Sequence, residues 1–586
     1  MIRTLYNQIG QYKRAALATP LLTALEVVMD VLIPYVTASL IDLGINAGNM
    51  SAVWRYGLVM VGMGLLSLFF GVMAGRVSAY ASTGFAANLR SSMYRNVQTF
   101  AFSDIDHYSS ASLITRMTTD VQNLQQAFQQ ILRVTVRAPF RLLLSIFMCI
   151  VIDARLSFIF IVAMVVLSVS LYLIVSRVAR LFSQVFERYD ALNQSVEENV
   201  RGMRVVKAFV REEYENDKFA RVAGQLYSIY VHAERLMALN HPVMNMVVYG
   251  CMIALSWWGA HFIVGGTLTT GELTSLFTYV MSILQSLMML SAIFVMLTQS
   301  AASARRVCDI IEHRPAIVSP EQPLLSVPDG SIAFSEVRFD YGGDQAAMAG
   351  RSKRSALFNV SFSVASGETI GIIGGTGSGK STLVSLISRL YDPLRGTVMV
   401  GGHDVRQYDL TVLRQQVGVV LQQSTLFTGT VLDNLRWGRA DATLEECRQA
   451  CRMAQADGFI MEMGQGYDTP IEQGGANLSG GQRQRLCIAR ALLKRPRILV
   501  FDDSTSACDM QTDALIQQAL RTGMPGVTKL IIAQRISTVS HCDRILVMDN
   551  GVVTGFDTHE RLLQTNELYR EIYDIQMKDI GDFDAP

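Results

Sequence analysis

Charged side chains are scarce in this chain. They make up 17% of its 586 residues, half of the residues are hydrophobic, and the mean hydropathy is +0.27. This balance excludes an ordinary soluble enzyme. Basic and acidic residues number 51 and 50, so the formal net charge is only +1. Proteins that bind nucleic acid carry a strong basic excess, and no nucleic-acid partner is therefore expected.

The eight cysteines lack the paired spacing of a metal site. Cys447 and Cys451 could share one face of a helix, but two thiols do not make a zinc site. We expect reduced, mostly buried cysteines in a protein that faces the cytosol. A cleavable signal peptide is not expected either, because the apolar segment after Arg14 continues far beyond a signal-peptide core.

Most of the long apolar runs of the chain lie before about residue 300. About 20 apolar residues allow a helix to cross the core of a bilayer. The pattern predicts a multi-pass membrane protein in contact with membrane lipids. The six candidate spans are roughly 16–43, 56–81, 134–152, 156–176, 242–264 and 273–300.

Basic residues are unevenly divided among the segments that join these spans. The connections after the first, third and fifth spans are short, and Arg55 and Arg155 are their only basic residues. Since basic loops stay on the cytosolic side, the two long connections and both termini are predicted in the cytosol, with the chain in the cell membrane. The long connections contain Arg90, Arg95, Arg116, Arg180, Arg188, Arg201, Arg204 and Arg211.

The long connections also keep a helical pattern, for example over 118–124. We interpret them as membrane helices that continue into the cytosol. Each is broken once, near Asp104–Tyr108 and near Phe209–Tyr214, and a short crosswise helix is expected at each break. Such helices could dock on a cytosolic domain and transmit its motion.

A proline-rich stretch without a long apolar run follows the last span, which is typical of a linker between domains. Short β-like runs at 331–339 and 357–364 come after it. The predicted division is a transmembrane domain over 1–312, a linker over 313–330, an α/β domain over 331–578 and a C-terminal tail over 579–586.

A glycine-rich loop stands between a predicted strand over 368–373 and a helical run over 383–390. It has the pattern of a phosphate-binding loop, in which glycines let backbone N–H groups wrap the phosphates. Lys380 would supply a charge to the β and γ oxygens, Ser381 would bind Mg²⁺, and the helix N-terminus would add its dipole. ATP and Mg²⁺ are therefore the expected cofactors. The loop consists of Gly374, Gly375, Thr376, Gly377, Ser378, Gly379, Lys380, Ser381 and Thr382.

A second motif reads Leu478-Ser479-Gly480-Gly481-Gln482. With it the chain resembles the ATP-binding cassette (ABC) transporters, and the resemblance covers essentially the whole length. It implies a membrane all-α domain of six helices, of the type IV ABC exporter kind, fused to an α/β P-loop nucleotide-binding domain. The family's order is complete here: six spans, phosphate loop, Gln422, the second motif, Asp502 after an apolar run, the segment 506–509, and a switch position at Gln534.

The same resemblance implies roles for single residues. Tyr341 would stack on adenine, Gln422 would sense the γ-phosphate and Mg²⁺, and Asp502 would hold Mg²⁺ through water. The Ser479–Gln482 segment would clamp the ATP bound to the other cassette of a dimer. One helix N-terminus facing another subunit's γ-phosphate would act as an electrostatic clamp.

Two positions depart from the family pattern. Asp503 stands where a catalytic Glu is usual, and Gln534 stands where the switch residue is usually His. A general base must be placed within a fraction of an ångström, and the shorter Asp withdraws its carboxylate by about 1.5 Å, which would cost about a hundredfold. Gln534 can donate a hydrogen bond to the γ-phosphate but has no titratable ring. The pattern resembles the degenerate-site subunit of bacterial heterodimeric multidrug-type ABC exporters.

The surroundings of Tyr341 leave two interpretations open. The segment after it, Gly342–Ser355, is longer than expected for the family, so Tyr341 could be a packed surface aromatic rather than an adenine contact. The segment itself contains basic residues and is interpreted as a solvated loop, with a regulatory or lipid-headgroup contact as the alternative.

Glu26 and Asp30 lie on one face of the first span, where charged groups are costly and usually face a cavity or a partner. They are candidates for contact with substrate or a cation, or else a structural pair with hydroxyl or Arg groups of neighbouring helices. The last span is rich in aromatic residues and Met, which would suit a permissive apolar pocket, although helix packing and lipid contact are favoured. These residues are Phe277, Tyr279, Met281, Met288, Met289, Phe294 and Met296.

The function hypothesis is a half-transporter that exports amphipathic drugs, lipids or hydrophobic peptides with ATP. Its partner would be a second ABC half-transporter that supplies the catalytic Glu. The outward direction follows from the resemblance alone. The alternatives are a homodimer with two slow sites, an ATP-gated regulator, or an importer on the same fold. Six apolar spans exclude a soluble ABC ATPase.

Overall fold

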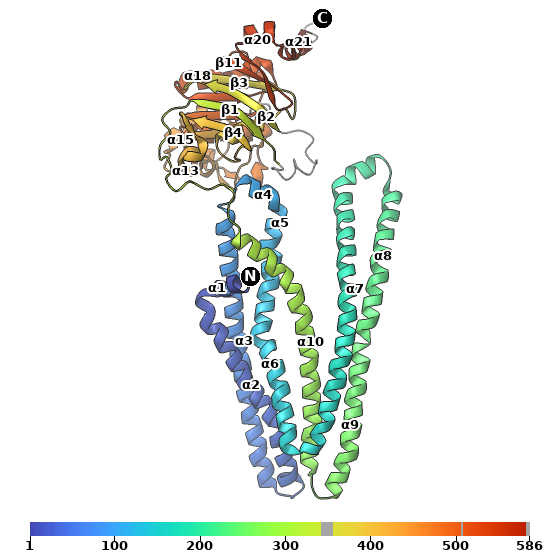
Figure 1. The fold of residues 1–586 in the computed structure, drawn as a ribbon. Coiled ribbons are helices and arrows are strands. Elements are labelled where there is room, and N and C mark those ends of the chain that lie inside the picture. The colour runs from blue at the N-terminus through green and yellow to red at the C-terminus, as the bar shows by residue number, and fades with distance from the viewer. Residues whose placement is uncertain (342–355, 505–507, 582–586) are drawn as a thin grey trace. The chain divides into compact units, whose positions relative to one another are not determined.

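The computed structural model describes residues 1–341, 356–504 and 508–581. It contains two compact units, which we describe separately (Figure 1). The membrane unit comprises Met1–Gln98 and Ala111–His313. The α/β unit comprises Thr99–Ser110 and Arg314–Pro586, so a short stretch from the first long connection belongs to it.

The membrane unit is entirely helical, and six of its helical stretches are long and apolar enough to cross a membrane. This confirms the six-span prediction. The candidate spans are Gly10–Ile45, Met50–Val97, Ser110–Ile152, Ala154–Val178, Glu212–Val264 and Thr270–Leu290. The helices are α1 (Ile2–Gln8), α2 (Lys13–Leu40), α3 (Met50–Val97), α5 (Ser110–Thr115), α6 (Val121–Ile152), α7 (Ala154–Ala208), α8 (Glu212–Ala238), α9 (Asn240–Val264) and α10 (Thr270–Glu312). Short 3-10 or π-helical turns adjoin them at Gly10–Tyr12, Ile41–Ile45 and Arg116–Asp120.

Polar caps begin the spans that follow the short connections. Asn49 Oδ1 accepts hydrogen bonds from the first N–H groups of α3, and Asp153 Oδ1 does the same for α7. Thr269 and Glu272 form a reciprocal capping box at the start of α10. Such caps satisfy backbone donors that a helix cannot pair itself, which lets each span start directly after a tight turn.

The core of the membrane unit joins the first, third, fourth, fifth and sixth spans. Val27, Met148, Leu255 and Leu276 are buried in one cluster there. Tyr279 is fully buried, and its hydroxyl donates to the backbone oxygen of Val31 at 2.7 Å. In this structure Tyr279 therefore packs α10 against α2, in keeping with the helix-packing interpretation.

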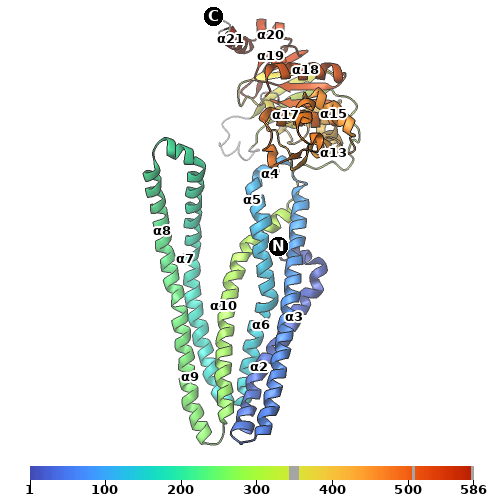
Figure 2. The same cartoon turned by 180° about the vertical axis from the view of Figure 1, so that it is seen from behind.

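Helices α7 and α8 run side by side, with α9 continuing α8, and diverge from α2, α3, α6 and α10 in both views (Figures 1 and 2). They confirm that the second long connection continues the membrane helices. The crosswise helix expected near Phe209–Tyr214 was wrong, because only a tight turn with Val210 at φ +52° separates the two helices. The acidic residues that begin at Glu212 favour a helix N-terminus, so α8 starts there at once.

The α/β unit contains a mixed sheet of six strands in the order β12-β11-β3-β10-β9-β6. All neighbours in it are parallel except the edge pair β11 and β12. Its strands are β3 (Thr369–Gly374), β6 (Val417–Val420), β9 (Ile498–Asp502), β10 (Thr528–Ile532), β11 (Arg544–Asp549) and β12 (Val552–Asp557). A second, antiparallel sheet has the order β2-β1-β4-β5, with β1 (Ile332–Phe339), β2 (Leu357–Val364), β4 (Arg395–Val400) and β5 (His403–Asp404). The small pair β7 (Gly429–Thr430) and β8 (Pro470–Ile471) completes the strands of the described residues.

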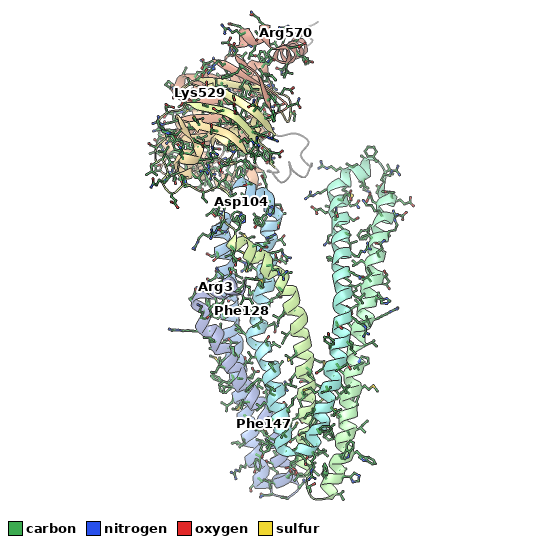
Figure 3. The ribbon with its side chains drawn as sticks, in the orientation of Figure 1. Arg3, Asp104, Phe128, Phe147, Lys529 and Arg570 are labelled. Carbon is green, nitrogen blue, oxygen red and sulfur yellow. The ribbon has the colours of Figure 1, made fainter. Side chains whose placement is uncertain are left out.

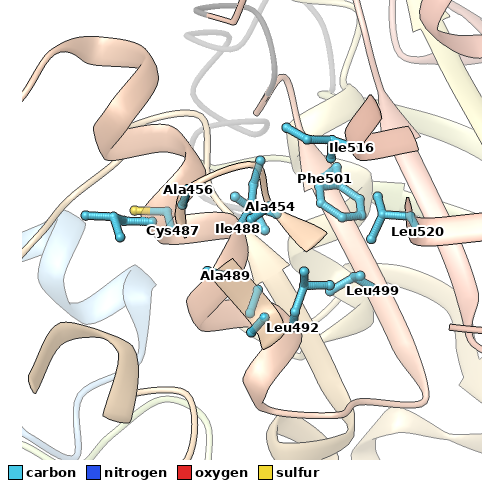
Figure 4. Packing of buried hydrophobic residues seen from close by; sticks show 14 of the residues in the cluster. Ala454, Ala456, Cys487, Ile488, Ala489, Leu492, Leu499, Phe501, Ile516 and Leu520 are labelled. Carbon is cyan, nitrogen blue, oxygen red and sulfur yellow. The ribbon is translucent and has the colours of Figure 1, made fainter. Parts of the chain in front are cut away.

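Helices cover these sheets and close two hydrophobic cores. One core lies between β9 and the helices α15, α17 and α18, where Ile488, Phe501 and Ile516 are buried together (Figure 4). The helices are α12 (Lys380–Ile387), α13 (Leu410–Gln416), α14 (Val431–Arg436), α15 (Leu444–Met453), α16 (Asp457–Glu462), α17 (Gly480–Leu493), α18 (Met510–Gly523), α19 (Ile536–Val539), α20 (His559–Thr565) and α21 (Glu567–Gly581). Short 3-10 turns occur at Val405–Gln407, Gly466–Asp468 and Gln473–Gly475. All eight cysteines of the chain are free, and all except the half-buried Cys542 are buried.

The first crosswise helix is present as α4 (Phe102–Tyr108), which belongs to the α/β unit. Asp104, labelled in Figure 3, fixes it from both sides. Its Oδ2 accepts from Ala101 N at 2.9 Å, which caps α4, and from Ala316 N at 3.1 Å, which ties α4 to the chain before β1. A buried carboxylate thus joins this helix to the α/β unit.

In the membrane unit, an arginine of the third span pairs with two carboxylates of the first span. Arg137 on α6 lies 3.2 Å from Glu26 and 3.2 Å from Asp30, both on α2. Asp30 also accepts from Ser67 Oγ on α3 at 2.6 Å. The network therefore connects three helices, as the interpretation of Glu26 and Asp30 as a structural pair expects, while their contact with substrate stays a prediction.

Replacing Arg137 with Met should destabilise the membrane unit by about 3 kcal/mol, because it leaves the buried carboxylate of Glu26 and the half-buried one of Asp30 without their cation. The measurement is thermal unfolding of the purified full chain in detergent. Arg155→Met, at an exposed position, is the matched control.

The triple variant Glu26→Gln, Asp30→Asn, Arg137→Met should recover most of the lost stability, since it removes the charges together. If it unfolds as early as Arg137→Met alone, the loss comes from packing of the arginine stem and not from unpaired charge.

Candidate active site

The candidate site lies at one edge of the six-stranded sheet. Parallel strands present their carboxyl ends at the same edge, where ligands bind in open α/β sheets. Ile532 at the end of β10 pairs with Asp502 at the end of β9 and with Ile372 near the end of β3. The phosphate loop follows β3, Asp503 follows β9 and Gln534 follows β10, so the register brings these segments together.

The phosphate loop depends on glycine at two positions. A Cβ at Gly374 would lie 2.1 Å from the backbone oxygen of Met548, and one at Gly379 would lie 2.6 Å from the backbone oxygen of Ala356. Gly379 also has φ +97°, a conformation that favours glycine. The close backbone approach therefore leaves no room for a side chain at these two positions of the loop.

Lys380 begins helix α12 and folds back over the loop. Its Nζ donates to the backbone oxygens of Gly374 at 2.9 Å and Gly375 at 2.7 Å. Burial lowers the pKa of Lys380, and the negative charges of Asp502 and Asp503 oppose that shift. A polyanionic phosphate chain would offer this ammonium a stronger partner than two carbonyls.

Ser381 and Asp502 lie next to each other, and Ser381 Oγ donates to Asp502 Oδ1 at 2.9 Å. Burial raises the pKa of Asp502, and the neighbouring charge of Asp503 adds to the rise. A divalent cation would compensate this buried negative charge, and a hydroxyl with a carboxylate is an oxygen donor set that suits Mg²⁺. The residues present therefore fit the metal expected from the sequence.

The two residues that depart from the family pattern are bonded to each other. Gln534 Nε2 donates to Asp503 Oδ2 at 2.6 Å. The Asp503 backbone is held in a left-handed conformation, φ +48°, with its N–H donating to Ile532 O at 3.1 Å. Gln484 on α17 donates to its backbone oxygen at 3.4 Å. The backbone of Asp503 is thus held by β10 and α17, and its carboxylate is oriented by Gln534, which follows β10.

The second motif forms the N-terminus of α17. Ser479 is the N-cap, its Oγ accepting from Gln482 N at 3.2 Å while its own N–H donates to Gln482 Oε1 at 2.9 Å. Leu478 is buried and anchors the turn, whereas Ser479 and Gly480 are exposed and Gly481 is half-buried. The positive end of a helix of 14 residues is therefore presented at the surface, which suits binding of an anion.

Aromatic side chains connect α4 with the phosphate-loop helix. The hydroxyl of Tyr391 donates to Asp106 on α4 at 2.6 Å, and its ring meets that of Tyr341 edge-on at 5.3 Å. The hydroxyl of Tyr341 lies 3.0 Å from Thr382 Oγ1 on α12. Burial and the Asp106 carboxylate raise the pKa of Tyr391, which keeps its proton on the hydroxyl. A displacement of α4 can therefore reach α12 through two tyrosines.

The placement of Tyr341 is compatible with both interpretations of its role. It packs against Phe339 and Tyr391, yet the residue is 56% exposed, which leaves a ring face for a base. Gln422 follows the carboxyl end of β6 and is exposed. Gly342–Ser355 and the motif residues Ser506 and Ala507 lie outside the described residues, and so does the tail beyond Gly581.

The substrate candidates Glu26 and Asp30 line a cavity of about 460 Å³ in the membrane unit. Ser67, Gly71 and Arg133 line it as well. A Cβ at Gly71 would lie 3.0 Å from Glu26 Oε1, so this glycine makes room for the carboxylate. Of the residues of the last span, Met281 and Met289 are partly exposed, and the side chain of Phe294 lies outside the described part.

Several residues of these sites were missed in the sequence. Arg137 carried a usable signal, since a charge inside an apolar run marks a functional or paired group. Tyr391 and Gln484 carried none, because tyrosine and glutamine are common and their partners are distant in the chain. Gln576 on α21 was also missed, although its amide donates to Gln534 O at 2.8 Å.

Comparison with known proteins agrees with this architecture. Residues 17–288 match the family model "ABC transporter transmembrane region", and residues 357–506 match the model "ABC transporter". An uncharacterised ABC transporter ATP-binding protein of Mycobacterium bovis is 34% identical over 97% of this chain and 97% of its own length. The ATP-dependent lipid A-core flippase of Syntrophus aciditrophicus is 31% identical over 84% of this chain and 80% of its own.

A further relative is the putative multidrug export ATP-binding/permease protein of Bacillus subtilis, 28% identical over 97% of this chain and 98% of its own. Among solved structures, a bacterial Atm1-family ABC exporter with ATP bound superimposes with a TM-score of 0.81 at 25% identity, covering 97% of this chain and 98% of that chain. The motifs, the two-part fold and these relatives lead to one conclusion: the chain belongs to the ABC transporters and has the type IV exporter fold, a six-span membrane domain fused to an ATP-binding domain.

Proposed function

We propose that this chain is one half of a heterodimeric ATP-driven exporter, in which its own ATP site is degenerate and hydrolysis occurs mainly at the site it completes for its partner. The partner is a second ABC half-transporter with a catalytic Glu. The six spans would cross the cell membrane, with both termini and the nucleotide-binding domain in the cytosol.

The observation that carries the proposal is the hydrogen bond between Gln534 and Asp503. A general base needs a free lone pair directed at the attacking water. Here Asp503 Oδ2 already accepts from an amide at 2.6 Å. Because that amide cannot take up a proton as a histidine ring can, the pair favours a stable arrangement over proton transfer. ATP would be held at this site but hydrolysed slowly.

The chain keeps every group needed for holding ATP. The phosphate loop and Lys380 would receive the phosphates, and Ser381 and Asp502 would hold Mg²⁺, with Gln422 beside the γ-phosphate. Mg²⁺ bound there would neutralise charge on the phosphate oxygens. Tyr341 would contact the adenine through its exposed face.

The exposed N-terminus of α17 would complete the partner's ATP site. Ser479, Gly480 and Gly481 would face the γ-phosphate of ATP bound to the partner's phosphate loop. The capping box of Ser479 and Gln482 keeps this helix end rigid, so little order is lost when the two cassettes close. Closure would then move α4 through Tyr391 and drive alternating access.

The cargo proposed for this exporter is amphipathic: a drug, a lipid or a hydrophobic peptide. Two relatives support this class by name, since one is a lipid A-core flippase and another a putative multidrug export protein. Glu26 and Asp30 would contribute the polar part of a substrate-binding region, beside the cavity on α2 and α3.

Two substitutions with unequal effects test the division of labour. In the purified heterodimer, Ser479→Ala in this chain should lower ATP turnover at least tenfold, because it loosens the helix end that binds the reacting γ-phosphate, a charge-assisted contact worth about 1.5–3 kcal/mol. Asp503→Ala should lower turnover less than about threefold, since little hydrolysis depends on it. Steady-state release of phosphate measures both.

Equal losses in the two variants would contradict the heterodimer. So would rapid hydrolysis and vanadate trapping by this chain purified without a partner, which would identify a homodimer with two working sites.

ATP binding is tested separately by Lys380→Met. This variant should weaken binding of a fluorescent ATP analogue to the full chain by at least tenfold, because a half-buried ammonium no longer meets the phosphates. Lys207→Met, at an exposed lysine paired with Glu212, should leave binding unchanged. Unaltered affinity in Lys380→Met would show that nucleotide is not held by this loop.

A further inference from the structure

The C-terminal helix α21 packs against the switch segment, residues 534–539, and one of its side chains, Gln576, hydrogen-bonds to that segment. Gln576 Nε2 donates to the backbone oxygen of Gln534 at 2.8 Å, and Gln576 Oε1 accepts from the backbone N–H of Ile536 at 2.8 Å. Both polar atoms of this amide are thus bonded to the backbone of the same short segment. A two-point contact fixes the direction of that segment as well as its distance from α21.

The switch segment needs such support. Helix α19, which begins at Ile536, is only four residues long, and its N-cap Arg535 makes no side-chain capping bond. Helices this short are not stable by themselves. The first N–H groups of any helix also lack partners within it. Gln576 supplies the acceptor for Ile536 from another helix and so acts as the missing cap.

Helix α21 is itself anchored near its N-terminal end, away from its contact with the switch segment. Tyr569 is fully buried, and its hydroxyl lies 2.6 Å from His559 Nδ1. Its N–H donates to Asn566 Oδ1 at 2.9 Å, which starts the helix. Gln576 follows Tyr569 by two helical turns and therefore lies on the same face. The buried Tyr569 and the contact residue Gln576 therefore belong to one continuous helix and would move together.

The contact continues to the candidate catalytic position. Gln534, whose backbone Gln576 holds, directs its own side chain to Asp503 Oδ2 at 2.6 Å. Two hydrogen bonds therefore link α21 to Asp503. The first joins Gln576 to the backbone of Gln534, and the second joins the side chain of Gln534 to Asp503.

We propose that Gln576 is a positioning residue through which α21 sets how long the ATP site of this chain retains its nucleotide. It acts on Gln534 and touches no ligand itself. This inference rests on the proposed function, because long retention is the property of a degenerate site. Movement of α21 would release the backbone of Gln534, turn its amide away from Asp503 and the γ-phosphate, and free the nucleotide.

The test measures nucleotide dissociation in the assembled transporter. Gln576→Leu should raise the rate at which a fluorescent ATP analogue with Mg²⁺ leaves the slow site by about tenfold, through loss of two hydrogen bonds. Gln576→Glu, which keeps the acceptor for Ile536 but loses the donor to Gln534, should give an intermediate rate. Asp574→Asn, at an exposed position of the same helix, is the matched control and should leave the rate unchanged.

A double-mutant cycle distinguishes positioning from general stability. If Gln576 acts through Gln534, Gln576→Leu should add nothing to the dissociation rate of Gln534→Ala. Additive effects, or a fall in the unfolding temperature that accounts for the faster dissociation, would overturn the proposal. Should the Ser479 and Asp503 variants instead show that this site hydrolyses normally, the cycle can still be measured on turnover, so the two proposals fail separately.

Discussion

Parallel pairing of β3 with β10 and of β10 with β9 is the constraint on which the ATP-binding domain depends. Because these strands run in the same direction, their carboxyl ends meet, and three segments far apart in the chain are forced to share one edge. Pairing of Ile532 with Asp502 sets the position of Asp503 relative to Gln534 to within a hydrogen bond. A shift of one residue in the register of β10 would move each of its side chains to the opposite face of the sheet and would separate Gln534 from Asp503. The chemistry of the site thus follows from strand register.

The parts of this site that could be predicted were those in which sequence determines the backbone directly. The phosphate loop is such a case, since Gly374 and Gly379 are required by atoms that would clash with any Cβ. The six spans are another, because length and apolarity are enough to define a membrane helix. The first crosswise helix was predicted correctly for a similar reason: a break in periodicity stands next to a residue, Asp104, able to cap it.

The parts that could not be predicted depend on which faces meet. Arg137 and Glu26 are more than a hundred residues apart, and only the rotation of α6 against α2 brings them together. The second crosswise helix failed because the acidic run after Arg211 starts α8 immediately, which a search for breaks in periodicity does not weigh. Gln576 lies 42 residues from Gln534, and nothing in a lone glutamine on an amphipathic helix indicates a two-point contact with a distant backbone.

These contacts together give the site of this chain two mechanical inputs. One arrives from the first long connection, through Asp106, Tyr391 and Tyr341, at the helix that carries Lys380. The other arrives from α21, through Gln576, at Gln534 and Asp503. Under the proposed function the two inputs have different uses. The contact of Tyr391 with α4 would pass the effect of phosphate binding to the first long connection, whereas the contact of Gln576 with Gln534 would set how long the nucleotide is retained. Under the same proposal, an Asp at position 503 and a Gln at position 534 would slow proton transfer at the site while leaving both inputs intact, which suits a subunit that holds ATP without hydrolysing it.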